Sequence, residues 1–365
     1  DNAVGEVRNF ENQDDGDYLG RQVEVSANGG VVASEAKFGF FVYSFDGSSL
    51  LPLGSLIDAV NFPRNLPNIV APSIGDPFWD NENDLSLSSD GQFIATSAQT
   101  SYNYVVNKPL TAIPYVRVFR LVSNEWVQVG DTLSDFADGQ GYHANGEAKI
   151  ALNHDGTVLV VGLSYIASDG IYIDYETYPD GDRTDRAGMV RTYRLIDGNW
   201  QQVGDDLLGS PGDYFGSSVS MSADGMRLAV GSAGKPSVST YQWTNQGWVR
   251  FGDEIGSTHF SSVIQFALSP NGQVLAIGNA QYSNDSGMVG VIRTYTYEED
   301  TVNVNFEFGN VLAFKIGGGA LNQVIARGGN ALSPNFDTLF GYDFFGWSEA
   351  TEAIGSDTNI TPILE

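Results

Sequence analysis

The chain has 365 residues, 42% of them hydrophobic, and a net charge of −27 from 45 acidic and 18 basic residues. Nucleic acids and anionic membrane surfaces are bound by basic patches, so this charge argues against both and favours cations or a basic partner. Cysteine is absent, which excludes disulfides, thiolate catalysis and cysteine-ligated zinc. No apolar run approaches the roughly 20 residues of a membrane helix, so no membrane insertion is expected.

One short pattern recurs six times along the chain, each time as a polar turn between two apolar runs. The copies centre on Asn28-Gly29, Asp90-Gly91, Asp155-Gly156, Asp224-Gly225, Asn271-Gly272 and Asn335-Phe336. Asp-Gly or Asn-Gly between apolar alternations predicts a tight hairpin with positive φ at both turn residues. Repetition at a long period indicates that one supersecondary unit is reused.

The fourth copy predicts the unit, a meander of four short strands. The first strand begins at Phe215-Gly216, the second and third cover residues 228–231 and 238–243, and the fourth follows Trp248 and ends at Gly252-Asp253. The copies are unevenly spaced, which radially arranged sheets tolerate and stacked solenoids do not. We therefore expect an all-β fold, a single β-propeller domain over residues 1–365. Six four-stranded antiparallel blades are expected, and seven stays open.

The two ends of the chain suggest how the ring closes. Residues 7–10 repeat the third-strand motif before any turn motif has occurred. This N-terminal strand is expected to complete the last blade, and residues 354–357 are expected to add its outermost strand. Such a closure removes the open sheet edge.

Several of these motifs resemble a known family. Phe215-Gly216, the Ser-x-Asp-Gly hairpins and the Gly-x-Val-Arg-x-Tyr runs followed by Trp-x-Gln-x-Gly-Asp resemble FG-GAP and integrin-α-like β-propeller repeats, over most of residues 5–350. The resemblance implies a secreted or cell-surface protein, and a first residue other than methionine is typical of a processed chain and equally of a trimmed one. At the start of a repeat's first strand the phenylalanine-glycine pair is intact once, at Phe215-Gly216, and the calcium loop of integrin-type repeats is absent as such.

The longest insert, residues 164–188, is acidic and rich in tyrosine. Its carboxylates are candidate Ca²⁺ ligands, because calcium takes six to eight oxygens from a flexible loop; they are Asp174, Glu176, Asp180, Asp182 and Asp185. A solvated acidic loop explains the same residues. The candidate binding residues for a protein or glycan are Tyr172, Tyr175 and Tyr178. Residues 12–17 and the group Asp76, Asp80, Glu82 and Asp84 are weaker calcium candidates that turn chemistry also explains.

Repeated charged residues are expected to hold the ring together. Arg8, Arg117, Arg191 and Arg293 share one strand position, and Asp131, Asp205 and Asp253 follow the glycine at the end of the fourth strand. The interpretation favoured is a blade-to-blade ion pair, with the aspartates also accepting backbone N–H groups in the turn. A ring of anion contacts is the alternative.

No catalytic motif is present, so we expect the chain not to be an enzyme. His154 fills a hairpin-turn position, and the sequons at Asn284 and Asn359 are candidate glycosylation sites. The expected function is a non-enzymatic extracellular or cell-surface module for interaction, adhesion or structural assembly, with a protein partner or self-association and calcium-ordered loops. The alternative is a carbohydrate-binding or glycoside-active protein that uses rim carboxylates and tyrosines.

Overall fold

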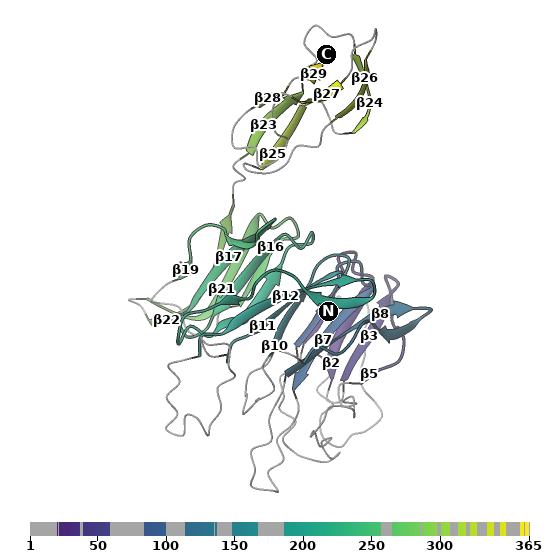
Figure 1. The fold of residues 1–365 in the computed structure, drawn as a ribbon. Coiled ribbons are helices and arrows are strands. Elements are labelled where there is room, and N and C mark those ends of the chain that lie inside the picture. Colours follow the sequence, from purple (N-terminus) through teal and green to yellow (C-terminus); the bar gives the residue numbers. More distant parts are fainter. Residues whose placement is uncertain are drawn as a thin grey trace, which may run out of the picture. The chain divides into compact units, whose positions relative to one another are not determined.

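A computed structural model gives the structure of the chain. It describes residues 20, 22–36, 39–58, 84–99, 114–134, 136, 148–166, 186–256, 265–284, 287–297, 301–306, 313–318, 322–326, 334–338, 344–347, 358–360 and 362–364. The chain divides into two compact units, residues 1–295 and 296–365. The regular elements described in both units are all β-strands (Figure 1).

The first unit contains five antiparallel sheets that follow one another along the chain. Blade 1 consists of β1 (Val23–Val25), β2 (Val31–Ala36), β3 (Gly39–Phe45), β4 (Leu50–Pro52) and β5 (Ile57–Asp58). Blade 2 consists of β6 (Asp84–Leu87), β7 (Phe93–Gln99), β8 (Pro114–Val122) and β9 (Glu125–Gln128). Blade 3 consists of β10 (Ala148–Leu152), β11 (Val158–Leu163), β12 (Met189–Ile196), β13 (Asn199–Gln202) and β14 (Leu207–Leu208).

The same order continues in the last two sheets. Blade 4 consists of β15 (Phe215–Met221), β16 (Arg227–Ser232), β17 (Ser237–Thr244), β18 (Gly247–Arg250) and β19 (Ile255–Gly256). The described strands of blade 5 are β20 (Gln265–Leu268), β21 (Val274–Asn284) and β22 (Gly287–Thr296). In blades 1, 3 and 4 the fourth strand is broken at the repeated glycine, and both pieces pair with the third strand. The predicted four-strand meander is therefore confirmed.

The blades pack against one another in chain order through their first strands. The strand β1 lies beside β6, β6 beside β10, β10 beside β15, and β15 beside β20. Figure 1 shows the sheets of the first unit in this succession. The fold is a β-propeller of five blades, so the prediction of the propeller is confirmed and the predicted six blades, with seven left open, is wrong.

The sixth predicted hairpin turn does not form. Pro334, Asn335 and Phe336 lie inside β26 (Pro334–Thr338), which pairs with β24 (Ala313–Gly318). In the five hairpins that do form, the last turn residue is a glycine with φ near +70°. Phenylalanine occupies this place in the sixth copy, and a residue with a Cβ rarely adopts that conformation.

The second unit contains the remaining strands in three small sheets. Its other strands are β23 (Thr301–Phe306), β25 (Asn322–Ala326), β27 (Phe344–Trp347), β28 (Thr358–Ile360) and β29 (Pro362–Leu364). The strand β23 pairs antiparallel with β25 and parallel with β28, while β27 pairs with β29. The predicted closing strand at residues 7–10 and the segment 354–357 lie outside the described residues. Ring closure and a single domain over residues 1–365 therefore stay predictions.

The hairpin turns are built differently from the predicted ones. In blade 2, Gly91 N donates to Ser88 O at 2.8 Å, and Gly91 has φ +71° while Asp90 is outside the positive-φ region. The Ser88 hydroxyl accepts from Phe93 N at 2.9 Å, and the Asp90 carboxylate accepts from Gln92 N at 2.9 Å. This is a type I turn followed by a left-handed glycine. The prediction of positive φ at both turn residues is therefore wrong.

A chain of backbone hydrogen bonds joins the turns of successive blades. Ala27 N donates to Ser89 O at 2.8 Å, and His154 N donates to Ala223 O at 2.8 Å. Asp90 N donates to His154 O at 3.2 Å, and Ala223 N donates to Pro270 O at 2.8 Å. We call these four bonds the turn ladder. The side chain of His154 is exposed, as its predicted place in a surface turn requires.

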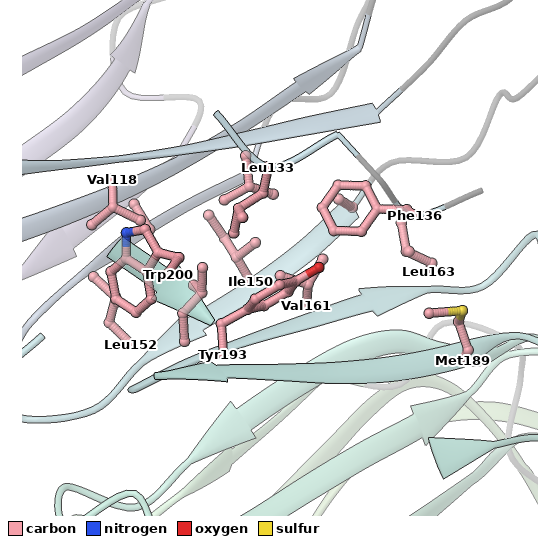
Figure 2. Close-up of a cluster of buried hydrophobic side chains, with 14 of the residues drawn as sticks. Val118, Leu133, Phe136, Ile150, Leu152, Val161, Leu163, Met189, Tyr193 and Trp200 are labelled. Atoms are coloured by element: carbon pink, nitrogen blue, oxygen red, sulfur yellow. The ribbon is translucent and has the colours of Figure 1, made fainter. Parts of the chain in front are cut away.

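The hydrophobic core lies between neighbouring blades. Figure 2 shows the interface of blades 2 and 3, where Val118, Leu133 and Phe136 face Ile150 and Tyr193. Similar clusters join blades 1 and 2 and blades 3 and 4. Each interface also holds one of the repeated tryptophans, whose indole Nε1 donates to the preceding blade. Trp126 donates to Leu53 O, Trp200 to Val129 O and Trp248 to Thr192 Oγ1.

Candidate functional site

Most of the sequence-predicted site residues lie outside the part of the chain that the structure describes. These are the proposed calcium ligands Asp174, Glu176, Asp180, Asp182 and Asp185, and the tyrosines Tyr172, Tyr175 and Tyr178. Residues 12–17 and Asp76, Asp80 and Glu82 lie outside it as well. Asn284 is the last residue of β21 and Asn359 lies in β28, and their glycosylation stays a prediction.

The repeated arginine does not form the predicted blade-to-blade pair where its partner is described. Arg191 Nε donates to Asp206 Oδ1, and its Nη2 donates to Asp206 Oδ2, each at 2.8 Å. Both residues belong to blade 3, and the partner is the residue after the repeated Asp205, whose side chain is exposed. The hydrogen-bonded carboxylate raises the pKa of the Arg191 guanidinium. The prediction is therefore wrong for Arg191, because the partner is Asp206 instead of Asp205 and the ion pair lies within one blade.

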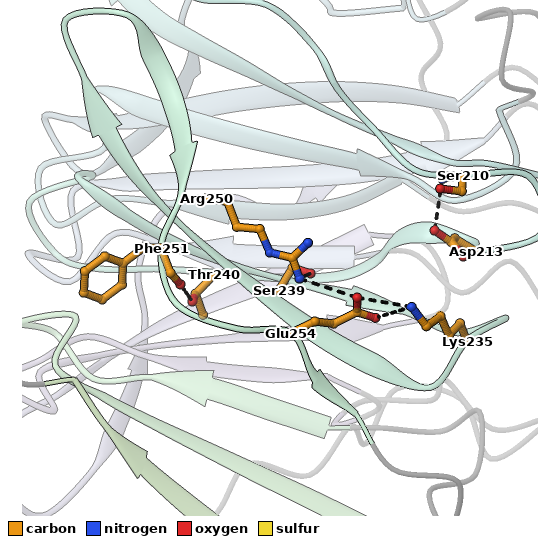
Figure 3. A network of polar contacts seen from close by, with 8 residues as sticks. All are labelled: Ser210, Asp213, Lys235, Ser239, Thr240, Arg250, Phe251 and Glu254. Carbon is orange, nitrogen blue, oxygen red and sulfur yellow. Dashed lines mark hydrogen bonds and ion pairs between the residues drawn. The ribbon is translucent and has the colours of Figure 1, made fainter.

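Blade 4 builds the same contact from a different strand. The position of Arg191 is taken by Ser239, and the position of Asp206 by Glu254. The guanidinium comes instead from Arg250, whose Nη2 contacts Ser239 Oγ at 3.3 Å and Glu254 Oε2 at 3.5 Å (Figure 3). Lys235 Nζ also binds Glu254. In blades 3 and 4 these charges therefore pair within their own blade.

A pocket lies where the first strands of all five blades meet. Its volume is about 470 Å³, and we call it the first-strand pocket. The lining includes residues of β1, β6, β10, β15, β16 and β20, and most of the side chains are polar or charged. Among the described residues, its polar lining residues are Gln22, Glu24, Asp84, Lys149, Ser217, Ser218, Ser232 and Gln265, and its aromatic lining residue is Phe266.

One ring of this lining takes the same position from every blade. Each of its five residues precedes the glycine of its own hairpin turn by the same number of residues; they are Gln22, Asp84, Lys149, Ser218 and Gln265. The repeats keep the turns, the tryptophans and the core at their equivalent positions. At this one position the five copies carry an acid, a base, an alcohol and two amides. The five repeats thus differ in the residue type at the position that lines the pocket.

Asp84 fixes the geometry of the ring. Its Oδ1 accepts from Gln22 Nε2 and its Oδ2 accepts from Ile150 N, both at 2.7 Å. The carboxylate therefore joins blades 1, 2 and 3. It also satisfies a backbone N–H on the free edge of β10, which no sheet partner reaches. Ser86 and Ser220 do the same for Leu152 N and Leu268 N.

The phenylalanine-glycine pair Phe215-Gly216 shapes the side of the pocket that blade 4 contributes. The register of β15 against β16 shifts between Phe215 and Ser218, so Gly216 and Ser217 form a β-bulge. Gly216 has φ +83°, and a Cβ there would lie 2.6 Å from the Met189 carbonyl oxygen of blade 3. The bulge places both Ser217 and Ser218 in the pocket lining. The bulge and the close approach to the Met189 carbonyl explain why a glycine follows Phe215 in this blade.

Glu24 is the carboxylate that the fold leaves available. Loss of solvation in the pocket, with a smaller contribution from the negative charge of Asp84, raises the pKa of Glu24 from 4.5 to about 7, although the residue as a whole is exposed. Among the described residues no hydrogen bond reaches the Glu24 carboxylate. In contrast, Asp84 is occupied on both oxygens. A proton or a positively charged group in the pocket would therefore bind at Glu24.

Sequence reasoning identified only one residue of this pocket, Asp84, and assigned it to an acidic cluster. The signal that could have identified the rest is the alignment of the repeats, because Gln22, Lys149, Ser218 and Gln265 share its position. Within the described ranges, no group of three or more His, Cys, Asp or Glu side chains is placed to hold a metal ion. The described residues also include no helix that is long and apolar enough to cross a membrane.

The comparisons with known proteins concern the fold alone. No family model matches the chain, and no curated protein matches it. Hydrazine synthase of Kuenenia stuttgartiensis is 11% identical with a TM-score of 0.41 and covers 75% of this chain and 70% of its own. A protein from Lactobacillus plantarum is 12% identical with a TM-score of 0.41, over 95% of this chain and 88% of its own. The Cps50 (Swd1) β-propeller domain of Myceliophteria thermophila is 10% identical with a TM-score of 0.36, over 78% and 90%.

Likeness at these levels assigns no activity to the chain. The expected lack of catalysis therefore stays a prediction. The likeness to FG-GAP repeats stays a prediction as well, since no family model matches.

Proposed function

We propose that the protein is a non-enzymatic binding module whose ligand is a small polar molecule held in the first-strand pocket. The observation that carries this proposal is the ring of five equivalent residues, one from each blade, which differ from one another where they line one cavity. Residues that serve only the ring architecture repeat, as the tryptophans and turn glycines do. Differing residues around a shared cavity favour recognition of an asymmetric ligand.

The size and chemistry of the pocket support a small hydrogen-bonding ligand. Its volume of about 470 Å³ falls within the roughly 300–1,000 Å³ of small-molecule sites. Ser218, Ser232 and Gln265 offer donors and acceptors, and Glu24 offers acceptors. An apolar ligand would bury these groups without partners, at a cost in free energy.

A carbohydrate-active protein is the second candidate function. The observation that favours it is Phe266, an aromatic residue in a polar pocket. A catalytic carbohydrate site would call for several converging acids over an aromatic platform, whereas the described lining has two carboxylates, Glu24 and Asp84. Binding of a polyol is therefore a better fit than hydrolysis. Adhesion, self-assembly, calcium binding and an extracellular location stay predictions.

Ligand binding with a blocked-pocket variant tests the proposal. A library of polar metabolites would be screened by thermal shift, and the positive compounds titrated by calorimetry. Gln265→Trp would fill the pocket, while Gln246→Trp places the same side chain on the exposed β17–β18 turn. We expect Gln265→Trp to abolish binding of the compounds found and Gln246→Trp to leave it unchanged. Compounds that bind both variants equally well would refute the assignment of the pocket.

A further inference from the structure

We infer that the ligand of the first-strand pocket carries a cationic amine, bound by the carboxylate of Glu24 and the amide oxygen of Gln22. This inference rests on the proposed function, because it names the chemical class of ligand for the same pocket. It is carried by two hydrogen-bond acceptors on residues that line the pocket and by the balance of charge in the lining.

The first acceptor is the side-chain oxygen of Gln22. The Asp84 carboxylate can only accept hydrogen bonds, so the Gln22 group 2.7 Å from it must be the Nε2 donor. That bond fixes the orientation of the amide and directs Oε1 away from Asp84. The Oε1 atom is buried, and no described residue donates a hydrogen bond to it. A buried acceptor without a donor costs free energy, which a ligand N–H group would recover.

The second acceptor is the carboxylate of Glu24, which lies in β1, two residues after Gln22, and in the same pocket lining. No hydrogen bond from the described residues occupies it, whereas Asp84 is held by Gln22 and Ile150. An ammonium group has three N–H donors and no acceptor. It can therefore donate to both acceptors and keep a third N–H group for another acceptor in the pocket.

The charges in the lining favour a cation over an anion. Glu24 and Asp84 carry negative charge, Lys149 carries positive charge, and the whole chain carries −27. A cation that enters would restore the Glu24 carboxylate from its protonated form and offset the repulsion by Asp84. A metal ion fits less well, since two carboxylates beside a lysine supply few of the oxygens it needs.

Three probes with one carbon skeleton and different charge test the inference. Glucamine, sorbitol and gluconate carry an amine, a hydroxyl and a carboxylate at one end of the same six-carbon polyol. Their affinities would be measured by NMR titration at about pH 8, where both Glu24 and an amine are charged. We expect glucamine to bind at least roughly tenfold more tightly than sorbitol, and gluconate to bind least.

The variants separate this inference from the proposed function. Glu24→Gln should remove most of the preference for glucamine and leave sorbitol affinity within about twofold. Asp253→Asn removes one exposed charge outside the pocket and should change neither. Equal affinity for glucamine and sorbitol in the wild type, tighter binding of gluconate, or displacement of glucamine by calcium would overturn the amine assignment. The proposed function would survive the first two results if Gln265→Trp still abolished binding.

Failure of all three probes to bind in a way that Gln265→Trp blocks would count against both proposals. Circular dichroism and thermal unfolding of every variant would establish that it is folded. If Glu24→Gln were unfolded, Glu24→Asp would replace it. A shortened carboxylate should weaken glucamine binding and leave sorbitol binding intact.

Discussion

The indole Nε1 of Trp200 donates a hydrogen bond to the backbone carbonyl of Val129, at 3.1 Å, and this bond joins blade 3 to blade 2. Trp126 makes the equivalent bond to Leu53 O between blades 2 and 1, at 2.8 Å. Each tryptophan therefore packs in an interface and also satisfies a carbonyl where the fourth strand of the preceding blade ends. The stability of the propeller depends on these interfaces.

Trp200→Phe should destabilise the protein by about 1–2 kcal/mol, because the Val129 carbonyl loses its donor while most of the apolar contact stays. Urea unfolding would measure the loss. The matched control is Trp243→Phe, since Trp243 packs against Trp248 but donates no indole hydrogen bond to a described residue. An equal cost for the two changes would mean that the interblade bond contributes nothing.

Gly130→Ala should destabilise the protein more than Gly198→Ala. Both glycines have a left-handed backbone, with φ +69° and φ +81°, so both substitutions carry about 1 kcal/mol of backbone strain. An added Cβ at Gly130 would also lie 2.9 Å from Trp200 Cδ1, while at Gly198 it meets no atom within 4 Å. The extra cost at Gly130 should be about 1–3 kcal/mol, measured by thermal unfolding. Similar costs at the two positions would contradict the contact.

A double-mutant cycle on Arg191 and Asp206 should give a coupling free energy of about 1–2 kcal/mol. The pair is bidentate, and its side chains are only 15% and 23% exposed, which limits screening by salt. The variants are Arg191→Gln, Asp206→Asn and their combination, followed by urea unfolding. Lys235→Gln serves as the exposed comparison, because the Lys235 side chain is 67% exposed, and should cost no more than about 0.5 kcal/mol. Coupling near zero would show that the blade does not depend on the pair.

Glu24 should give the stability a recognisable dependence on pH. Its pKa in the folded protein, about 7, lies above its ordinary value of 4.5. Between these values the folded state retains a proton that the unfolded state has lost, so the free energy of unfolding falls as pH rises through this window. Glu24→Gln should abolish this part of the slope and be more stable than the wild type above about pH 7. Chemical unfolding over the window measures it, and an unchanged slope would place the titration elsewhere.

The repeating architecture could be predicted from the sequence because it depends on local residue types. Each repeated feature predicts one recurring part of the fold: the hairpin glycines predict turns, the alternating residues predict strands, and the three tryptophans predict packing. The meander from Phe215 to Arg250 follows the predicted order of four strands. The predicted number of blades was wrong because of a single residue, Phe336, which occupies the position where the hairpin turn requires a glycine. Without that glycine, residues Pro334–Thr338 form the strand β26 in place of a turn.

The candidate site could not be predicted because it depends on which residues the ring brings together. Gln22, Asp84 and Lys149 lie far apart in the sequence and share nothing except their place before a turn. Their chemistry differs, so no motif search finds them. The acidic insert at residues 164–188 drew attention by composition, but it lies mainly outside the described residues and its role stays a prediction.

The turn ladder has a consequence for how a further blade could be joined. In each of its four bonds an N–H group of one turn points to a carbonyl of the next, so the ladder has a direction along the chain. Pro270 accepts the bond from Ala223 but has no N–H group to donate in turn. Blade 2 shows the other route, because Ser89 accepts there and the following residue, Asp90, donates. A designed chain that adds one more blade would therefore have to bond it through the N–H group of Asn271.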